Sequence, residues 1–342
     1  MKAVVYTNPG TVKVQEIPIP ETLPDEIKVK IEYCALCATD VHLVYNGLFQ
    51  VKPPLILGHE MSGSIVEIGS KAALETNFKI GDHVTANPVR HCGECVYCRK
   101  GQPSHCIHAA FDQNKKPMDC MAEYRTFLPS QLYKLPDGVS LLHGCLTEPL
   151  TTVSRGIELS GISFGSTVCV SGAGSIGLIM LDALKYCGAA KLTVIDPIPE
   201  KRTLALEMGA EHAIDPTSED VIAEAMRITN GIGFDYVFEM SGVPSAGEIC
   251  GDLVANLGCI EFFAVYPEDY TLPLNLFKLF NKEARIQFTF TNPYLYPKSI
   301  DLLKRLDMDK IIGPVYDIED APQAFEDFKK AKHPKLLIKC SR

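Results

Sequence analysis

The sequence has no excess of basic residues and no long apolar segment, and each absence argues against a class of function. Its 342 residues carry a formal net charge of −9, which argues against nucleic acid or an anionic membrane surface as the main partner. No uninterrupted apolar stretch is long enough to span a bilayer, and the N-terminus lacks the apolar core and cleavage site of a signal peptide. We therefore expect a cytoplasmic protein.

The remaining composition is that of an ordinary globular protein, with 46% hydrophobic and 22% charged residues and enough length for two domains. Thirteen cysteines are present, but a disulfide scaffold is typical of short secreted chains. Here the count is odd, the chain is long and four cysteines crowd into one loop, so we expect free thiols and a metal.

The first ninety residues predict a β-rich domain. The segments 12–16 and 27–31 alternate apolar and polar residues, as half-buried strands do, and prolines separate them. Several short strands joined by glycine turns are typical of a partly open barrel.

The loop at residues 91–107 predicts a structural zinc site. Two-residue spacings let thiolates converge on one tetrahedral ion, and four of them close its coordination sphere. A closed sphere leaves no room for a substrate. The four predicted ligands are Cys92, Cys95, Cys98 and Cys106.

From residue 167 the pattern changes to alternating strands and helices, an α/β arrangement. A short apolar strand is followed by the string Gly172-Ala173-Gly174-Ser175-Ile176-Gly177, a helical stretch and a second strand that ends at Asp196. In such a unit the glycines and the helix N-terminus bind a pyrophosphate, and the acid accepts hydrogen bonds from the ribose hydroxyls. Asp196 favours NAD over NADP. Lys201 and Arg202 could instead offer charge to a phosphate, or form a solvated helix start.

The stretch Gly58-His59-Glu60 follows an apolar run and places two potential metal ligands side by side. A single buried histidine is usually a hydrogen-bonded core residue, so the case for a metal depends on other residues. With its later glycines, this stretch resembles the signature of the zinc-dependent medium-chain dehydrogenase/reductase superfamily, and the cysteine loop and the glycine string follow in that family's order. The matching residues are Gly58, His59, Glu60, Gly63 and Gly69, with a small residue at Ala72.

The resemblance covers the whole chain and implies two domains with the active site between them. Residues 1–155 and 286–342 would form a GroES-like catalytic β-barrel domain, and residues 156–285 a Rossmann NAD-binding domain with a doubly wound parallel sheet. Relatives form homodimers or homotetramers through the Rossmann domain.

By the same resemblance, Cys37, His59 and Glu148 are ligands of a catalytic zinc, and Glu60 is a ligand that can alternate with water or substrate. Thiolate, imidazole and carboxylate are all zinc donors, and three protein ligands leave one position open. The acid at Glu148 is typical of the sorbitol and threonine dehydrogenase-like branch.

The resemblance also implies a mechanism. Zinc lowers the pKa of the substrate hydroxyl, and hydride passes from the alkoxide to nicotinamide C4. Thr39 and His42 match a proton relay, and Asp40 a carboxylate that orients His59. Helix capping is the alternative role for Thr39 and Asp40. In relatives, segments that include Ser241, Val265 and Phe290 line the nicotinamide side.

The sequence therefore predicts an enzyme with two zinc ions per chain, one catalytic and one structural, and NAD. Its substrate would be a secondary alcohol of a polyol, sugar alcohol or cyclitol. L-threonine and 2,3-butanediol are alternative substrates, because Thr291 stands where we align the substrate-facing arginine of sorbitol dehydrogenases. A zinc-independent NADPH enone reductase or a non-catalytic cofactor-binding protein is the alternative of another class, and the retained zinc ligands argue against both.

Overall fold

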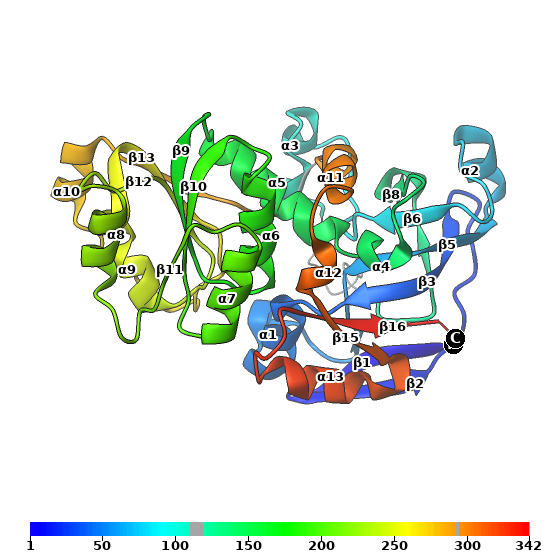
Figure 1. The fold of residues 1–342 in the computed structure, drawn as a ribbon. Helices are drawn as coiled ribbons and strands as arrows, with labels where there is room; N and C mark the ends of the chain where they lie inside the picture. Colours follow the sequence, from blue (N-terminus) through cyan, green and yellow to red (C-terminus); the bar gives the residue numbers. More distant parts are fainter. Residues whose placement is uncertain (110–118, 292–293, 342) are drawn as a thin grey trace. The chain divides into compact units, whose positions relative to one another are not determined.

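The computed structural model describes residues 1–109, 119–291 and 294–341, and it divides into two compact units (Figure 1). Unit 1 contains Met1–Thr151 and Asn292–Arg342, and unit 2 contains Thr152–Thr291. In the described part of the chain, no helix combines the length and the apolar character needed to cross a membrane.

Unit 1 is built on two β-sheets. The smaller sheet has the strand order β2-β1-β4, and the larger has the order β15-β16-β3-β5-β6-β8, with β7 paired to β3. The strands are β1 (Lys2–Asn8), β2 (Thr11–Glu16), β3 (Ile27–Ala35), β4 (Leu55–Ile56), β5 (Glu60–Ile68), β6 (His83–Ala86), β7 (Tyr124–Phe127), β8 (Leu132–Lys134), β15 (Ile312–Asp317) and β16 (Lys335–Lys339).

The core of unit 1 follows the predicted alternation. In β3 the side chains of Ile27, Val29 and Ile31 are fully buried, and the polar residues between them are only half-buried. Short helices complete the unit: α1 (Ala38–Asn46), α2 (Ser70–Glu75), α3 (Val96–Arg99), α4 (Leu141–Gly144), α11 (Tyr296–Leu303), α12 (Met308–Ile311) and α13 (Ala321–Phe328). Helix α5 (Thr147–Ser160) begins in unit 1 and ends in unit 2.

Unit 2 is a parallel sheet with the strand order β11-β10-β9-β12-β13-β14. The strands are β9 (Ser166–Ser171), β10 (Ala189–Ile195), β11 (His212–Ile214), β12 (Phe234–Glu239), β13 (Val254–Phe262) and β14 (Arg285–Phe288). Numbered within the unit, this is the order 3-2-1-4-5-6 of a doubly wound dinucleotide-binding fold. The predicted α/β class is confirmed.

Helices pack on this sheet next to the strands that they connect (Figure 1). They are α6 (Ser175–Leu184), α7 (Pro199–Glu207), α8 (Val221–Ile228), α9 (Pro244–Leu253) and α10 (Leu276–Lys282). The strand order reverses between β9 and β12, so the loops after these two strands open a crevice where ligands bind in such folds. Both loops carry residues of the predicted cofactor site.

Candidate active site

Three of the predicted catalytic zinc ligands lie together in unit 1. One ligand atom each from Cys37, His59 and Glu60 lies within 4.8 Å of the other two. The antiparallel pairing of β3 with β5 explains why these three residues lie together. It places Ala35 opposite Glu60 and so brings the end of β3 beside the start of β5. Thiol, imidazole and carboxylate are all zinc donors, so this donor set fits the metal.

Gly58 has to be a glycine for this arrangement. Its φ is 86°, in the left-handed region, and an added Cβ would lie 2.4 Å from the Met121 side chain and 2.7 Å from Cys34 Sγ. The glycine therefore lets the chain turn tightly into His59.

Asp40 contacts both the N-terminal end of α1 and the imidazole of His59. Its carboxylate accepts hydrogen bonds from the Cys37 N–H at 3.1 Å and the Gly58 N–H at 3.0 Å. One of its oxygens also lies 3.5 Å from His59 Nδ1. The two roles considered for Asp40, helix capping and orientation of His59, are thus compatible in one side chain.

The charges around His59 favour its protonated form. Burial lowers the pKa of His59, but Asp40 and then Cys37 outweigh burial and raise it well above the ordinary histidine value. An imidazole oriented by a carboxylate is a strong electron donor to a metal when the proton is absent.

A buried lysine, which the sequence analysis did not identify, contacts Glu60. Lys335 begins β16 and is 1% exposed, and its Nζ lies 2.7 Å and 2.6 Å from the two carboxylate oxygens of Glu60. Burial opposes the charge of Lys335, but Glu60 and then Cys37 and Glu148 outweigh burial and raise the lysine pKa. Glu60 therefore lies within reach of both a metal at Cys37 and a fixed cation.

Glu148 is half-buried in the first turn of α5 and is not part of the 4.8 Å group. Its charge nevertheless acts in the same neighbourhood, because it contributes to the raised pKa values of Lys335 and of the buried Tyr296. The Tyr296 ring stacks on Tyr133 with centroids 4.4 Å apart, and its hydroxyl donates to the Ala86 carbonyl.

The two residues of the predicted proton relay lie on α1. Thr39 is half-buried and His42 is exposed, and a separation of three residues places them on one face of the helix. His42 Nδ1 lies 3.2 Å from the Asn46 amide nitrogen. Because His42 is exposed, its imidazole is in contact with solvent.

The four cysteines of the predicted structural site also come together. All four sulfurs of Cys92, Cys95, Cys98 and Cys106 lie within 4.8 Å of one another. Backbone N–H groups point at the sulfurs, and the N–H of Cys98 is the main cause that lowers the pKa of Cys95 to about 6. Four thiols in such a shell fit a closed tetrahedral zinc site.

In unit 2, each glycine of the glycine string has a distinct place. Gly172 has a φ of 105° and lies against Ser241, so that a Cβ would be 3.0 Å from the Ser241 backbone nitrogen. A Cβ on Gly177 would lie 1.9 Å from the Gly172 carbonyl oxygen, whereas one on Gly174 would meet nothing within 4 Å. In a dinucleotide-binding fold the first glycine makes the tight turn, the second lets the backbone approach the pyrophosphate, and the third lets the helix pack closely on the strand. Gly172, Gly174 and Gly177 fit these three roles in that order.

The helix after these glycines begins with Ser175 and Ile176, both half-buried, and its N-cap is Gly174. The first N–H groups of a helix have no partner within the helix and favour an anion. The residues around Gly174 therefore fit a pyrophosphate.

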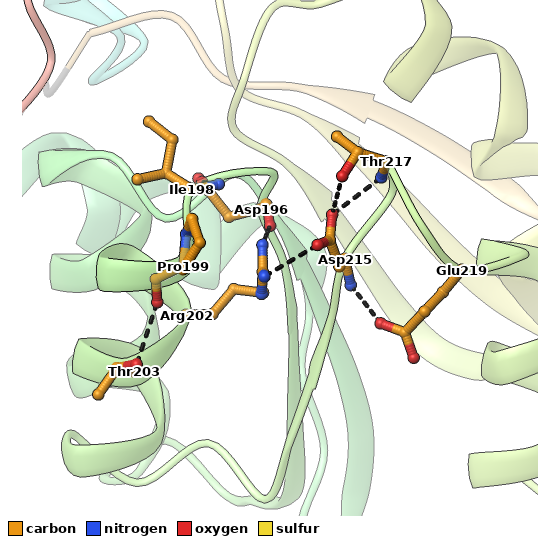
Figure 2. A network of polar contacts seen from close by, with 8 residues as sticks. All are labelled: Asp196, Ile198, Pro199, Arg202, Thr203, Asp215, Thr217 and Glu219. Atoms are coloured by element: carbon orange, nitrogen blue, oxygen red, sulfur yellow. Dashed lines mark hydrogen bonds and ion pairs between the residues drawn. The ribbon is translucent and has the colours of Figure 1, made fainter.

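Asp196 follows β10 and ties the glycine turn to the next loop. Its carboxylate accepts hydrogen bonds from the Ala173 N–H at 2.7 Å and the Ile198 N–H at 2.9 Å. Arg202, in α7, donates to the Asp196 carbonyl at 2.7 Å (Figure 2). Lys201 lies beside it in the first turns of α7 and is half-buried.

The remaining predicted cofactor residues lie in loops at the strand ends. Ser241 follows β12, and its N–H and hydroxyl both donate to the buried Glu239. A Cβ on Gly242 would lie 2.8 Å from the Val265 carbonyl oxygen, so these two loops are adjacent. Val265 and Phe290 are 65% and 48% exposed.

Comparison with known proteins identifies the two units. Residues 23–137 match the family described as the alcohol dehydrogenase GroES-like domain, and residues 175–305 match the zinc-binding dehydrogenase family. The chain is 31% identical to L-threonine 3-dehydrogenase of Pyrococcus horikoshii over 353 residues, with 99% of this chain and 98% of the relative covered. It is 29% identical to sorbitol dehydrogenase of Bacillus subtilis over 343 residues, with 99% and 96% covered.

Solved structures agree over the whole length. A protein of Clostridium scindens assigned to the zinc-binding dehydrogenases superposes with a TM-score of 0.93 at 33% identity, with 99% of each chain covered. A Sinorhizobium meliloti protein of the same assignment, solved with NADP bound, gives 0.91 at 30% identity and 98% coverage of each chain. The 2R,3R-butanediol dehydrogenase of Bacillus subtilis gives 0.89 at 26% identity, with 99% of each chain covered.

Proposed function

Because the chain belongs to the zinc-type medium-chain dehydrogenase/reductase superfamily, as its sequence predicted, and is an oxidoreductase of CH–OH groups, we propose a more specific reaction. The protein oxidises a secondary alcohol of a polyol, sugar alcohol or cyclitol reversibly to the ketone, with NAD as acceptor. The observation that carries this proposal is the meeting of Cys37, His59 and Glu60 within 4.8 Å, separate from the four-thiol cluster.

We propose that Cys37, His59 and Glu148 hold the catalytic zinc. When bound, zinc supplies a Lewis acid that lowers the pKa of the substrate hydroxyl, and NAD supplies the hydride acceptor. Asp40 orients His59 through Nδ1, which leaves Nε2 for the metal. Cys37 and Glu148 together offset the charge of a dication.

Glu60 is the alternating ligand in this proposal, and Lys335 competes with the metal for its carboxylate. The contacts of 2.6 and 2.7 Å with Lys335 Nζ would hold the Glu60 carboxylate whenever water or substrate took its place as a ligand. The proton of the substrate leaves by Thr39 and then His42, whose exposed ring exchanges it with solvent.

NAD is the proposed cofactor, although a structural relative was solved with NADP. The Asp196 carboxylate lies at the end of β10, the position that binds ribose hydroxyls in this fold. A 2′-phosphate there would meet a buried negative charge, because Asp196 is only 5% exposed. Lys201, Ser241, Val265 and Phe290 complete the cofactor contacts.

The acid Glu148 in place of a thiolate is the reason to prefer polyols. L-threonine and 2,3-butanediol are the second choice, because dehydrogenases of both kinds are similar to this chain at 31% and 26% identity. A zinc-independent NADPH enone reductase or a non-catalytic cofactor-binding protein would have no use for the three grouped ligands.

Two measurements test the proposal. Metal analysis of the purified protein should find about two zinc ions per chain, and one ion held only by the cysteine loop would refute the catalytic site. A panel of polyols, cyclitols, amino alcohols and diols, scored by NADH absorbance, should then give turnover with the first two groups. Faster turnover with NADP than with NAD would refute the assignment of Asp196.

We also propose that the enzyme is a homodimer, or a homotetramer built from such dimers. β14 is the last strand of its sheet, and α10, which packs on the neighbouring strand β13, exposes large apolar side chains. An open edge beside an apolar surface is typical of a two-fold sheet interface. The exposed fractions are 73% for Leu276, 75% for Phe277, 79% for Phe280 and 65% for Phe288.

The interface has a direct test. Replacing Phe280 and Phe288 with glutamate should give monomers in light scattering after size exclusion, whereas the same change at Leu74, an exposed residue of unit 1, should not. An unchanged mass in the first variant would refute this interface.

The proposed compartment is the cytoplasm. All thirteen cysteines are free thiols in the structure, and reduced thiols persist in a reducing compartment. Localisation of a tagged protein by cell fractionation tests this assignment.

A further inference from the structure

Two aspartates mark the ends of neighbouring strands in unit 2. Asp196 follows β10 and Asp215 follows β11, and these strands are parallel partners with Ile195 opposite Ile214. The carboxyl ends of both strands therefore lie at one edge of the sheet. Only Asp196 belongs to the cofactor site described above.

Arg202 lies between these two aspartates (Figure 2). One terminal nitrogen donates to the Asp196 carbonyl oxygen at 2.7 Å, and the other lies 2.9 Å from an Asp215 carboxylate oxygen. The arginine side chain is 16% exposed and the aspartate side chain is 19% exposed. Both ends of the guanidinium group are thus held by acceptors of the protein.

The loop after β11 fixes Asp215 in this position. Its second carboxylate oxygen accepts hydrogen bonds from the N–H of Thr217 at 2.9 Å and from the Thr217 hydroxyl at 2.6 Å. The Asp215 N–H donates to Glu219 at 2.6 Å (Figure 2). The Thr217 hydrogen bonds, and to a lesser degree Arg202, lower the pKa of Asp215. Asp215 is therefore a fixed negative charge.

In dinucleotide-binding folds, an acid at the end of the second strand favours NAD and an arginine nearby accommodates the 2′-phosphate of NADP. This chain has both groups, so Asp196 alone does not decide how a 2′-phosphate is received. We propose that Asp215 is a specificity-determining residue that excludes 2′-phosphorylated cofactors by holding Arg202. The inference rests on the proposed use of NAD.

Asp215 and a 2′-phosphate would compete for the same cation, the guanidinium group of Arg202. A 2′-phosphate near Asp196 gains most from a bidentate contact with a guanidinium group. While Asp215 holds Arg202, that contact requires the protein to give up an ion pair and leave a fixed carboxylate beside the new phosphate. Without the charge of Asp215, Arg202 is free to turn towards the phosphate.

Binding of two nucleotides that differ only in the 2′-phosphate tests the inference. The full-length protein with Asp215→Asn should bind 2′,5′-ADP about tenfold more tightly than wild type in isothermal titration, the size expected for one gained charged hydrogen bond. Its affinity for 5′-AMP should stay within about twofold. Retained 5′-AMP binding also shows that the site is folded.

Two further variants separate this role from a general effect of charge. Glu219→Gln removes the charge of another acid in the same network, whose carboxylate accepts a hydrogen bond from the Asp215 N–H, so neither affinity should change. Adding Arg202→Gln to Asp215→Asn should abolish the gain for 2′,5′-ADP. A gain that persists without Arg202, or no gain in Asp215→Asn, would overturn the inference.

Turnover plays no part in this measurement. Absence of alcohol oxidation would therefore count against the proposed reaction alone. Wild-type protein that already binds 2′,5′-ADP as tightly as 5′-AMP would overturn the inference, because no exclusion would then exist.

Discussion

Lys335 and Glu60 form a buried ion pair whose partners are far apart in the sequence. Both side chains are 1% exposed, and 275 positions separate the residues. Removal of one partner of such a pair leaves an uncompensated charge in a poorly solvated place. The pair thus makes the candidate zinc site sensitive to Lys335, a residue outside the predicted motifs.

We expect Lys335→Met to lower the free energy of unfolding by about 3–5 kcal/mol, because the buried Glu60 carboxylate would lose its lysine partner. Urea denaturation of the zinc-loaded protein measures the change. Lys339→Met, at the other end of β16 and half-buried, is the matched control and should be close to wild type. The double variant Glu60→Gln/Lys335→Met should recover most of the loss; a Lys335→Met protein as stable as wild type would contradict the role of the pair.

Glu261 is a buried acid at the end of β13 and gives a pH dependence to stability. It is 1% exposed, and burial raises its pKa to about 7, although Thr289 and Arg155 partly oppose this shift. A raised carboxyl pKa adds stability that is present below the unfolded value near 4.5 and is lost as the pH rises through 7.

We therefore expect Glu261→Gln to exceed wild type by less than about 1 kcal/mol at pH 5 in urea denaturation and by up to about 3 kcal/mol at pH 8. The variant keeps an acceptor for the Thr289 hydroxyl. An equal difference at both pH values would show that the effect comes from packing and not from ionisation.

At the scale of elements, the turn between β9 and α6 depends on contacts that leave no room for a side chain. The Cβ of an alanine at position 177 would lie 1.9 Å from the Gly172 carbonyl oxygen, whereas position 174 is open. Alanine at position 177 should thus disturb the packing of the turn, whereas alanine at position 174 should leave the fold intact.

We expect Gly177→Ala to displace α6, lower stability by about 1–3 kcal/mol and reduce binding of both 5′-AMP and NAD. Gly174→Ala should fold like wild type and lose affinity only for ligands with a pyrophosphate, because its methyl group occupies the approach path. Thermal unfolding and titration with the two ligands separate these effects. Normal NAD binding by Gly177→Ala would be inconsistent with the close packing.

The elements and the local motifs could be predicted from the sequence, because their signals are local. Alternation predicted β3, the glycine string predicted the turn before α6, and the spacing of Cys92, Cys95 and Cys98 predicted a sulfur cluster. Lys335 could not be predicted, because it begins an ordinary alternating strand and its partner comes from another strand of the same sheet. The proposed role of Asp215 could not be predicted either, because side-chain directions at strand ends depend on tertiary contacts.

At the scale of the whole molecule, the two predicted metal groups lie in unit 1 and the nucleotide-binding elements lie in unit 2. Each unit has a core of its own. Loss of one zinc ion from unit 1 should therefore leave nucleotide binding by unit 2 unchanged.

We expect Cys98→Ser to reduce the zinc content from about two ions per chain to about one and to lower the thermal unfolding midpoint, because a structural zinc contributes folding free energy. Binding of 5′-AMP should remain within about twofold of wild type. Cys187→Ser, a half-buried thiol in unit 2, is the control for metal content. Loss of both zinc ions together with nucleotide binding would contradict the independence of the units.

The position of Arg202 and Asp215 also has a consequence for how this enzyme could change over time. The groups that we propose to select the cofactor lie in one continuous stretch from the end of β10 to the loop after β11, and they share no residue with the proposed metal ligands. One or two codon changes in this stretch would move the enzyme from one cellular pool of reducing equivalents to the other, while the alcohol that it oxidises stays the same.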